Sequence, residues 1–236
     1  MPLKLADFRI HSAVLELRYA KVFALWDNAG AMAAGLQGSF PALDLEDAKP
    51  NAQRFLLEKG MSAELKIDRA HISQFYPDSA LEKLQKGADV FCEVLTSGLN
   101  QREFERIGLR IIFEKLFETR DDAAAYLTAS APTLVRQGKF FNVEGGHLLD
   151  GDVSFRWEGE TLGCRVQLMT GEKTLEVSIP ADFPDVPPIK SKKRMVLVDV
   201  DYYAHSNTPV AKFKASAVIE SWLRVIRRDL EGFVDG

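Results

Sequence analysis

The chain has 236 residues, of which 46% are hydrophobic and 27% are charged, a composition typical of a folded globular protein. It carries 30 Lys and Arg against 34 Asp and Glu, so its formal net charge is −4, which argues against coating nucleic acid through bulk positive charge. Collagen-like, disordered and disulfide-stapled chains are excluded by the same figures, and no apolar run approaches the roughly 20 residues that a membrane span needs.

The N-terminal residues indicate the compartment. The first twelve, MPLKLADFRIHS, contain neither an uninterrupted apolar region nor a small-residue cleavage site, so they do not resemble a signal peptide. Only two cysteines are present, Cys92 and Cys164, and nothing local brings them together. We therefore expect a cytoplasmic protein with two unpaired, buried thiols.

The first half of the chain alternates between strand and helix patterns. Residues 13–19 (AVLELRY) alternate in polarity and predict a half-buried strand, and residues 25–40 predict an Ala- and Gly-rich helix. A polar connector is expected at 42–51, followed by strands around 53–59 and 62–76. A helix capped by Asp78 or Ser79 is expected to end at Gly98.

The next strand, residues 103–117, has the clearest alternation. One face carries hydrophobic side chains, at Ile107, Leu109, Ile111, Phe113 and Phe117, and the other carries Arg106, Gly108, Arg110 and Glu114. A short helix over 121–129, capped by Asp121 or Asp122, closes the first half.

The second half is expected to be mostly strand. Strands at 147–157, 161–169 and 173–179 are separated by turn-like residues at 157–160 and 170–173. The Pro-rich residues 180–194 predict a crossing loop with a solvated basic run, and 194–203 predict the last strand. The chain ends in an amphipathic helix over about 213–234, and its three tryptophans, Trp26, Trp157 and Trp222, are expected in the core.

This order of elements predicts an α+β fold of mainly antiparallel sheet backed by amphipathic helices. A boundary near Ala131–Pro132 would divide the chain into an N-terminal lobe, 1–131, and a C-terminal lobe, 132–236. The second lobe would be a β-meander with a long C-terminal helix. The two lobes could be a distant structural duplication.

Asp199 and Asp201 form the sharpest candidate site. Two carboxylates at positions i and i+2 of a strand share a face, about 7 Å apart at roughly 3.3 Å of rise per residue. Metal-dependent phosphoryl-transfer enzymes and nucleases hold divalent cations with such a pair. The alternative is an acidic, solvated sheet face that discourages edge pairing.

Charged side chains on two other strands form a second candidate. Arg106, Arg110 and Glu114 share the polar face of one strand, and Glu16 and Arg18 share that of another. If the strands are neighbours, these residues form either an arginine-lined anion site or a solubilising ladder of ion pairs. No zinc-type spacing of the histidines and no G-x-S-x-G motif is present, and no cofactor is expected.

Three segments together resemble a known family. Residues 106–116 (RIGLRIIFEKL) resemble the arginine-glycine-leucine-arginine strand of a sporadically distributed family of uncharacterised bacterial proteins of about 250 residues. Residues 195–203 (MVLVDVDYY) resemble its late acidic strand, which precedes a C-terminal helix ending in a phenylalanine, here Phe233, and AVLELRY is similar to its first strand. Where the family usually has an aromatic residue and an asparagine, this chain has Ile111 and Ile112. The resemblance implies a fold but no activity.

Three functions follow from these patterns. Because no motif combines a nucleophile, a base and an orienting group, the favoured hypothesis is a non-enzymatic interaction module that binds a partner protein or forms a homo-oligomer. The alternatives are a metal-dependent phosphoryl-transfer or nuclease-like enzyme using Asp199 and Asp201, and an anion or small-molecule sensor using Arg106 and Arg110. Membrane association is not expected.

Overall fold

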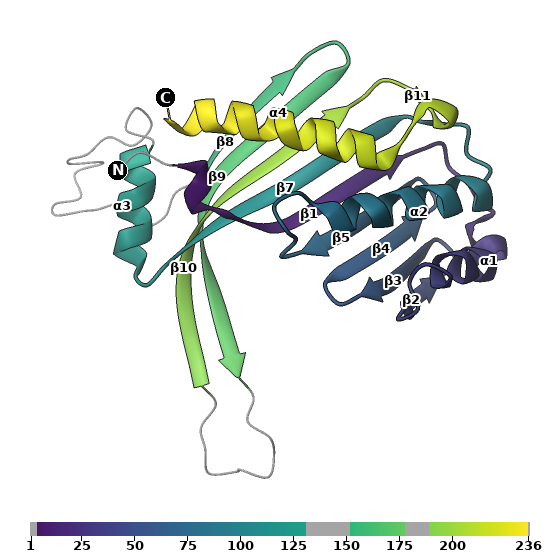
Figure 1. Ribbon diagram of the computed structural model, residues 1–236, viewed down its shortest axis with the longest axis horizontal. Helices are drawn as coiled ribbons and strands as arrows, with labels where there is room; N and C mark the ends of the chain where they lie inside the picture. The colour runs from purple at the N-terminus through teal and green to yellow at the C-terminus, as the bar shows by residue number, and fades with distance from the viewer. Residues whose placement is uncertain (1–3, 131–151, 178–188, 236) are drawn as a thin grey trace, which may run out of the picture.

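A computed structural model describes residues 4–130, 152–177 and 189–235. Its main feature is one antiparallel sheet of nine strands in the order β2-β3-β4-β5-β1-β7-β10-β9-β8 (Figure 1). The strands are β1 (Arg9–Arg18), β2 (Asp44–Lys49), β3 (Ala52–Glu58), β4 (Met61–Lys66), β5 (Arg69–Phe75), β7 (Arg106–Phe117), β8 (Asp152–Glu158), β9 (Leu162–Val177) and β10 (Ile189–Ala204). The short strands β6 (Glu103–Phe104) and β11 (Thr208–Pro209) form a separate pair.

The α+β prediction is confirmed, but the two halves do not form separate lobes. β10 from the second half pairs along its length with β7 from the first, so a single sheet runs through both. The expected boundary at Ala131–Pro132 lies outside the described residues. The division into lobes was wrong because the long β7–β10 pairing joins segments that the sequence pattern treats as independent.

Three helices lie side by side on one face of the sheet (Figure 1). They are α1 (Leu25–Gln37), α2 (Glu82–Gly98) and α4 (Ala215–Asp235). The side chains of β1, β7 and β10 that point towards them are buried, as the alternation predicted; they include Leu15, Leu17, Leu109, Ile111, Val198 and Val200. Asp89 of α2 accepts a hydrogen bond from the backbone N–H of Ser216 at 2.9 Å and so caps the start of α4.

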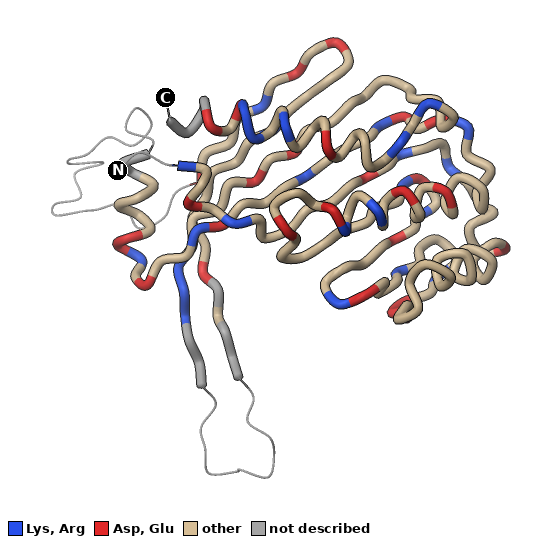
Figure 2. The backbone as a smooth tube through the Cα atoms, viewed as in Figure 1, with Lys and Arg blue, Asp and Glu red and all other residues tan. Residues whose placement is uncertain are grey.

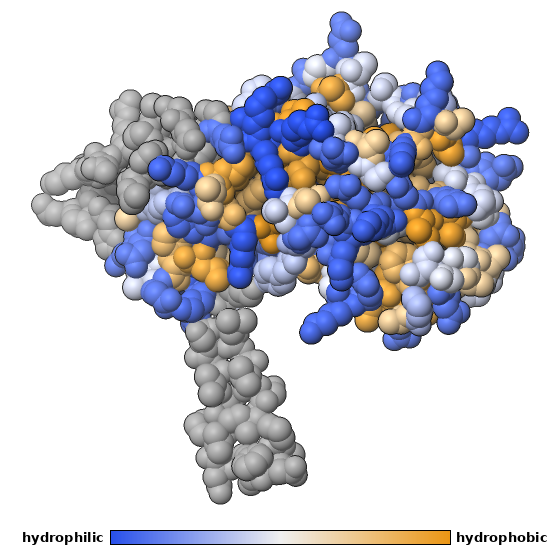
Figure 3. Space-filling model, in the orientation of Figure 1, coloured by the Kyte–Doolittle hydropathy of each residue, from blue (hydrophilic) through white to orange (hydrophobic). Residues whose placement is uncertain are grey.

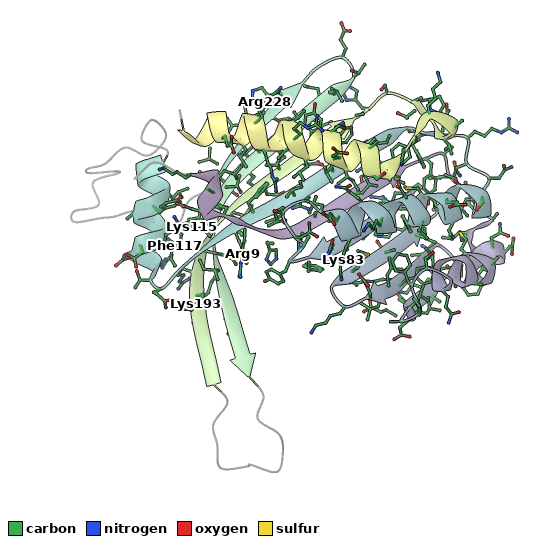
Figure 4. All side chains as sticks on the ribbon, in the orientation of Figure 1. Arg9, Lys83, Lys115, Phe117, Lys193 and Arg228 are labelled. Carbon is green, nitrogen blue, oxygen red and sulfur yellow. The ribbon has the colours of Figure 1, made fainter. Side chains whose placement is uncertain are left out.

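A further helix, α3 (Arg120–Ser130), and the 3₁₀ turn η1 (Leu5–Asp7) cover one end of this face, whereas the 3₁₀ turn η2 (Val210–Lys212) precedes α4. Lys115 of β7 joins α3 to η1, because its Nζ lies 4.0 Å from the centre of the Tyr126 ring and 2.9 Å from Asp7 Oδ2. Figure 4 shows Lys115 beside Phe117 at the point where α3 meets the sheet. Thr119, rather than Asp121 or Asp122, accepts a hydrogen bond from a first-turn N–H of α3, that of Asp122.

Two predicted breaks in strand structure are absent. The turn expected at 170–173 lies within β9, which continues to Val177. The basic residues Lys190–Arg194 lie on β10 rather than in a loop, and residues 178–188 lie outside the described residues. Because β7 ends its pairing at Phe117, opposite Arg194, the first residues of β10 pair with β9 alone and form a two-stranded arm (Figure 1).

The remaining differences concern exposure and edges. The predicted connector at 42–51 contains the edge strand β2, whose six residues are all exposed. Trp26 and Trp157 are about half exposed rather than in the core, whereas Trp222 of α4 packs edge-on against Tyr202.

Both cysteines are unpaired, as expected, although only Cys92 is fully buried. Among the described helices, none combines the length and hydrophobicity that crossing a membrane requires.

Candidate functional site

The face of the sheet opposite the helices carries all seven residues that the sequence singled out. We call it the open face. Glu16 and Arg18 lie on β1, Arg106, Arg110 and Glu114 on β7, and Asp199 and Asp201 on β10. These three strands are neighbours, so the condition for cross-strand pairing is met. The open face lies behind the sheet in the view of Figure 1.

Arg106 is the centre of one chain of ion pairs. Its Nη1 donates to Glu16 Oε1 at 2.8 Å, and its Nη2 donates to Asp201 Oδ2 at 3.1 Å. Arg18 also donates to Glu16 Oε1, at 2.8 Å. The guanidinium carbon of Arg106 lies 4.4 Å from the centre of the Tyr203 ring, and this cation–π contact fixes the side chain from a third direction.

Arg110 and Asp199 form a separate bidentate pair. The Nε and Nη2 of Arg110 donate to the two carboxylate oxygens of Asp199 at 2.9 and 2.6 Å. The Asp199 side chain is only 9% exposed, whereas that of Arg110 is 55% exposed. The arginine therefore shields the carboxylate from water. Its Nη1 takes no part in this pair.

The environment of Asp201 differs from that of Asp199. Burial raises the pKa of Asp201, and nearby Glu16 adds to this effect, although Arg106 and Arg110 partly oppose it. Both aspartates thus already have guanidinium partners, which a metal ion would have to displace. Within the described part of the chain, no group of three or more His, Cys, Asp or Glu is placed to hold a metal ion. The metal site stays a prediction.

Glu114 lies further along β7 and is the most buried acidic residue described on the open face. Its side chain is 0% exposed, and its Oε1 accepts from Arg9 Nε at 2.7 Å and lies 2.6 Å from Arg9 Nη2. Its Oε2 is 3.0 Å from His11 Nδ1, but the two atoms are not oriented as a hydrogen bond. A buried carboxylate thus holds an arginine that is itself 55% exposed.

Two exposed aromatic rings lie to one side of this pair. The His11 ring packs edge-on against Phe75, with centroids 6.1 Å apart, and against Tyr76 at 5.0 Å. The Arg9 guanidinium lies 5.2 Å from the centre of the Tyr76 ring. Phe75 and Tyr76 are 51% and 47% exposed. We call Arg9, His11, Phe75 and Tyr76, above buried Glu114, the aromatic–arginine patch; Figure 4 shows Arg9 near the crossing of β1 and β7.

The backbone is irregular on both sides of this patch. The register of β1 against β7 shifts between Ile10 and Ser12, so His11 is the extra residue of a β-bulge. Tyr76 has a φ of +48°, a conformation uncommon for a residue other than glycine, and its N–H donates to the His11 carbonyl at 2.8 Å. Bulges and left-handed residues are concentrated at functional sites, where they redirect side chains.

Most of the patch was missed by sequence reasoning. Glu114 was selected for its place on an alternating strand, but Arg9, His11, Phe75 and Tyr76 were not selected. The available signal was a pair of adjacent aromatic residues at the end of a predicted strand, immediately before Pro77. Their meeting with Arg9 depends on the β1–β5 register, which places Ser12 opposite Phe75.

The centre of the open face has no excess of one charge. Arg9, Arg106 and Arg110 each hold a carboxylate, so their charges are locally balanced. The Nη1 atoms of Arg9 and Arg110 make no hydrogen bond to any described residue and are available as donors to an acceptor group. The arrangement can thus bind neutral or weakly acidic groups beside an apolar surface, rather than concentrate free anions.

The chain was compared with known proteins. No protein-family model matches it, and no curated protein does. The resemblance to a sporadically distributed bacterial family therefore stays a prediction.

Proposed function

We propose that this protein is a non-enzymatic interaction module that binds a partner protein through the open face of its sheet, with the aromatic–arginine patch as the energetic centre. The single observation that carries this proposal is that two half-exposed aromatic rings pack against His11, beside an exposed arginine that the buried carboxylate of Glu114 holds.

The composition of the patch matches that of binding hot spots. Tyr and Arg are enriched among the residues that dominate binding energy, and aromatic residues are enriched at interfaces generally. Here Phe75, Tyr76 and Arg9 lie together on a face that the helices leave uncovered. Scattered single exposed hydrophobic residues need no explanation, but adjacent rings beside an arginine favour recognition.

The patch is also preorganised. Arg9 is held by Glu114 from below and by the Tyr76 ring from the side, while Tyr76 is tied to the His11 backbone. Fixing a side chain before binding removes an entropy cost of about 0.5–1.5 kcal/mol for each long side chain that an interface immobilises. Burying the Glu114 carboxylate costs desolvation free energy. That cost is consistent with a recognition role, because recognition requires Arg9 to be held in a fixed geometry.

The chemistry of the patch specifies the partner. The free Nη1 of Arg9 requires a carbonyl or carboxylate acceptor, and the neighbouring rings require an apolar or aromatic side chain. We therefore expect the partner to present a segment in which an aromatic or aliphatic residue lies beside such an acceptor.

The experiment compares three immobilised proteins: the wild type, the Phe75→Ser/Tyr76→Ser variant and a Phe23→Ser control. Phe23 is 80% exposed and immediately precedes α1, a helix on the side of the sheet opposite the open face (Figure 1), so the control loses a comparable apolar surface elsewhere. Proteins captured from the native host are identified by mass spectrometry, purified and titrated calorimetrically. We expect the wild type and Phe23→Ser to bind the same partner, and Phe75→Ser/Tyr76→Ser to bind it at least 10-fold more weakly.

A partner that binds all three proteins equally would show that the open-face patch is not the binding site. The proposal is also wrong if every protein captured by the wild type is captured by Phe75→Ser/Tyr76→Ser as well, or if the wild type captures no protein. Circular dichroism spectra of each variant exclude loss of folding as the cause.

The two alternative functions can be tested separately. Calorimetry with Mg²⁺ or Mn²⁺ tests the metal-dependent enzyme, which requires binding that Asp199→Asn abolishes. Native mass spectrometry of freshly purified protein tests the anion sensor, which requires a retained ligand that is lost in Arg110→Ala.

A further inference from the structure

The outer surface of α1 differs from that of the other two helices. Its inner side is buried through Leu25, Met32 and Leu36, and the Asn28 side chain donates to the Gly98 carbonyl at the end of α2. Its outer side exposes Trp26, 51% exposed, and Phe23, just before the helix, is 80% exposed. Two large, exposed aromatic side chains are therefore found at the start of α1, a helix that lies at one end of the molecule (Figure 1).

This surface is almost free of charge. Residues 22–43 contain one charged side chain, Asp27, in a chain in which 27% of residues are charged. Figure 2 shows α1 almost entirely in the colour of uncharged residues, and Figure 3 shows hydrophobic and neutral surface in its vicinity. The exposed side of α2 carries Glu82, Lys83, Lys86 and Glu93 instead. A solvated helix normally has charged residues on its outer face, so α1 has the surface of an interface.

The order of bulky and small side chains along α1 favours a second copy of this chain as the partner that covers its outer surface. The bulky residues Phe23 and Trp26 lie at its N-terminal end, and the exposed small residues Gly30 and Ala34 follow. A two-fold interface presents the same patch on both sides, so the patch must be complementary to itself. Two antiparallel α1 helices related by an axis near Gly30 meet this condition, because each bulky end faces the other's small end.

Charge favours the same arrangement. A two-fold axis places identical charges near each other, which is unfavourable for a strongly charged patch, but α1 contributes only Asp27. Antiparallel helices also place the positive N-terminal end of one dipole near the negative C-terminal end of the other. A Cβ added at Gly30 would have no heavy atom within 4 Å, so the centre of the surface is open to a close approach.

The available area sets the strength of the contact. A buried aromatic side chain removes about 150–250 Å² from water, so Phe23 and Trp26 together offer roughly 300 Å² per copy at their observed exposure. A standard stable interface buries about 800 Å² per partner. We propose that α1 is the centre of a weak, two-fold dimer of this chain, in which the bulky end of one copy, with Phe23 and Trp26, packs on the small-residue end of the other, with Ala34, and the two Gly30 residues meet at the axis.

Sedimentation equilibrium over a concentration series tests the dimer. We expect the wild type to change from monomer to dimer as its concentration rises to the millimolar range, and Trp26→Glu to stay monomeric. Phe75→Ser, on the open face, is the matched control and should dimerise like the wild type. A wild type that is monomeric throughout, or a dimer unaffected by Trp26→Glu, overturns the proposal. A different protein captured through Trp26 by a monomeric wild type would assign the surface to a foreign partner and would also overturn it.

Cysteine cross-linking tests the geometry. In the antiparallel arrangement, Gly30→Cys places two thiols close to the axis, where oxidised glutathione should link them into a covalent dimer. Gln37→Cys is the control, because seven residues at 1.5 Å each place its two copies roughly 20 Å apart. Faster linking by Gln37→Cys than by Gly30→Cys would refute the antiparallel arrangement. The dimer does not depend on the proposed function, and Phe75→Ser and Trp26→Glu separate the failure of one from the failure of the other.

Discussion

Removing Arg9 should destabilise this protein more than neutralising its partner Glu114. The Glu114 side chain is 0% exposed and that of Arg9 is 55% exposed. Substituting Arg9 therefore leaves a buried group unpaired, whereas substituting Glu114 leaves an exposed group unpaired. Arg9→Met leaves a buried carboxylate without its guanidinium, which costs about 3–5 kcal/mol in comparable buried pairs. Glu114→Gln leaves an arginine that can be solvated, so we expect a loss of only about 1–2 kcal/mol.

The double variant isolates the effect of the unpaired carboxylate. In Arg9→Met/Glu114→Gln no buried charge is left unpaired, so it should be more stable than Arg9→Met alone although it carries an additional substitution. Urea unfolding followed by circular dichroism measures all three. At an m value of about 1–3 kcal/mol/M, Arg9→Met should lower the midpoint by about 1 M or more.

A surface pair provides the control. Arg224 and Glu220 of α4 are 76% and 64% exposed, so Arg224→Met should change the free energy of unfolding by less than about 0.5 kcal/mol. If Arg9→Met is no more destabilising than Glu114→Gln, or if the double variant is the least stable of the three, the carboxylate is not stranded by the loss of Arg9. The account of the patch as a preorganised site would then be wrong.

Three further predictions concern other residues. Arg110→Met should destabilise the protein more than Asp199→Asn in urea unfolding, because Asp199 is the buried partner of that pair. Burial raises the pKa of Asp201 above its ordinary value of 3.8, so its ionised form is disfavoured in the folded state. As the pH falls from neutral towards 3.8, the stability of the wild type relative to Asp201→Asn should therefore rise, which urea unfolding at several pH values measures. Gly30→Ala should raise the free energy of unfolding by about 0.5–1 kcal/mol, measured by thermal unfolding of the dilute monomer, because the added methyl group meets no neighbour.

The face on which each side chain lies was predictable from the sequence. The alternation along β7 placed Leu109 and Ile111 on one face and Arg106 and Arg110 on the other, and the structure confirms both assignments. Such predictions succeed because successive side chains of an extended backbone point to opposite faces, whatever the strand pairs with.

Local patterns failed where tertiary pairing decided the outcome. β2 is a strand only as the edge partner of β3, and its charged, wholly exposed residues are typical of a protected edge rather than of a sequence-encoded strand. Thr170 and Gly171 are residues typical of turns, but β9 continues through them because β10 pairs with it on one side.

The sequence by itself determined which side chains lie on the polar side of each strand, among them Glu16, Arg106 and Asp201. Only the tertiary structure decided which of them touch, because the contacts join residues about 90 positions apart and depend on strand order and register. The aromatic–arginine patch is the clearest case: the bulge at His11 and the left-handed backbone at Tyr76 are consequences of fitting β1 between β5 and β7, and no local pattern specifies either.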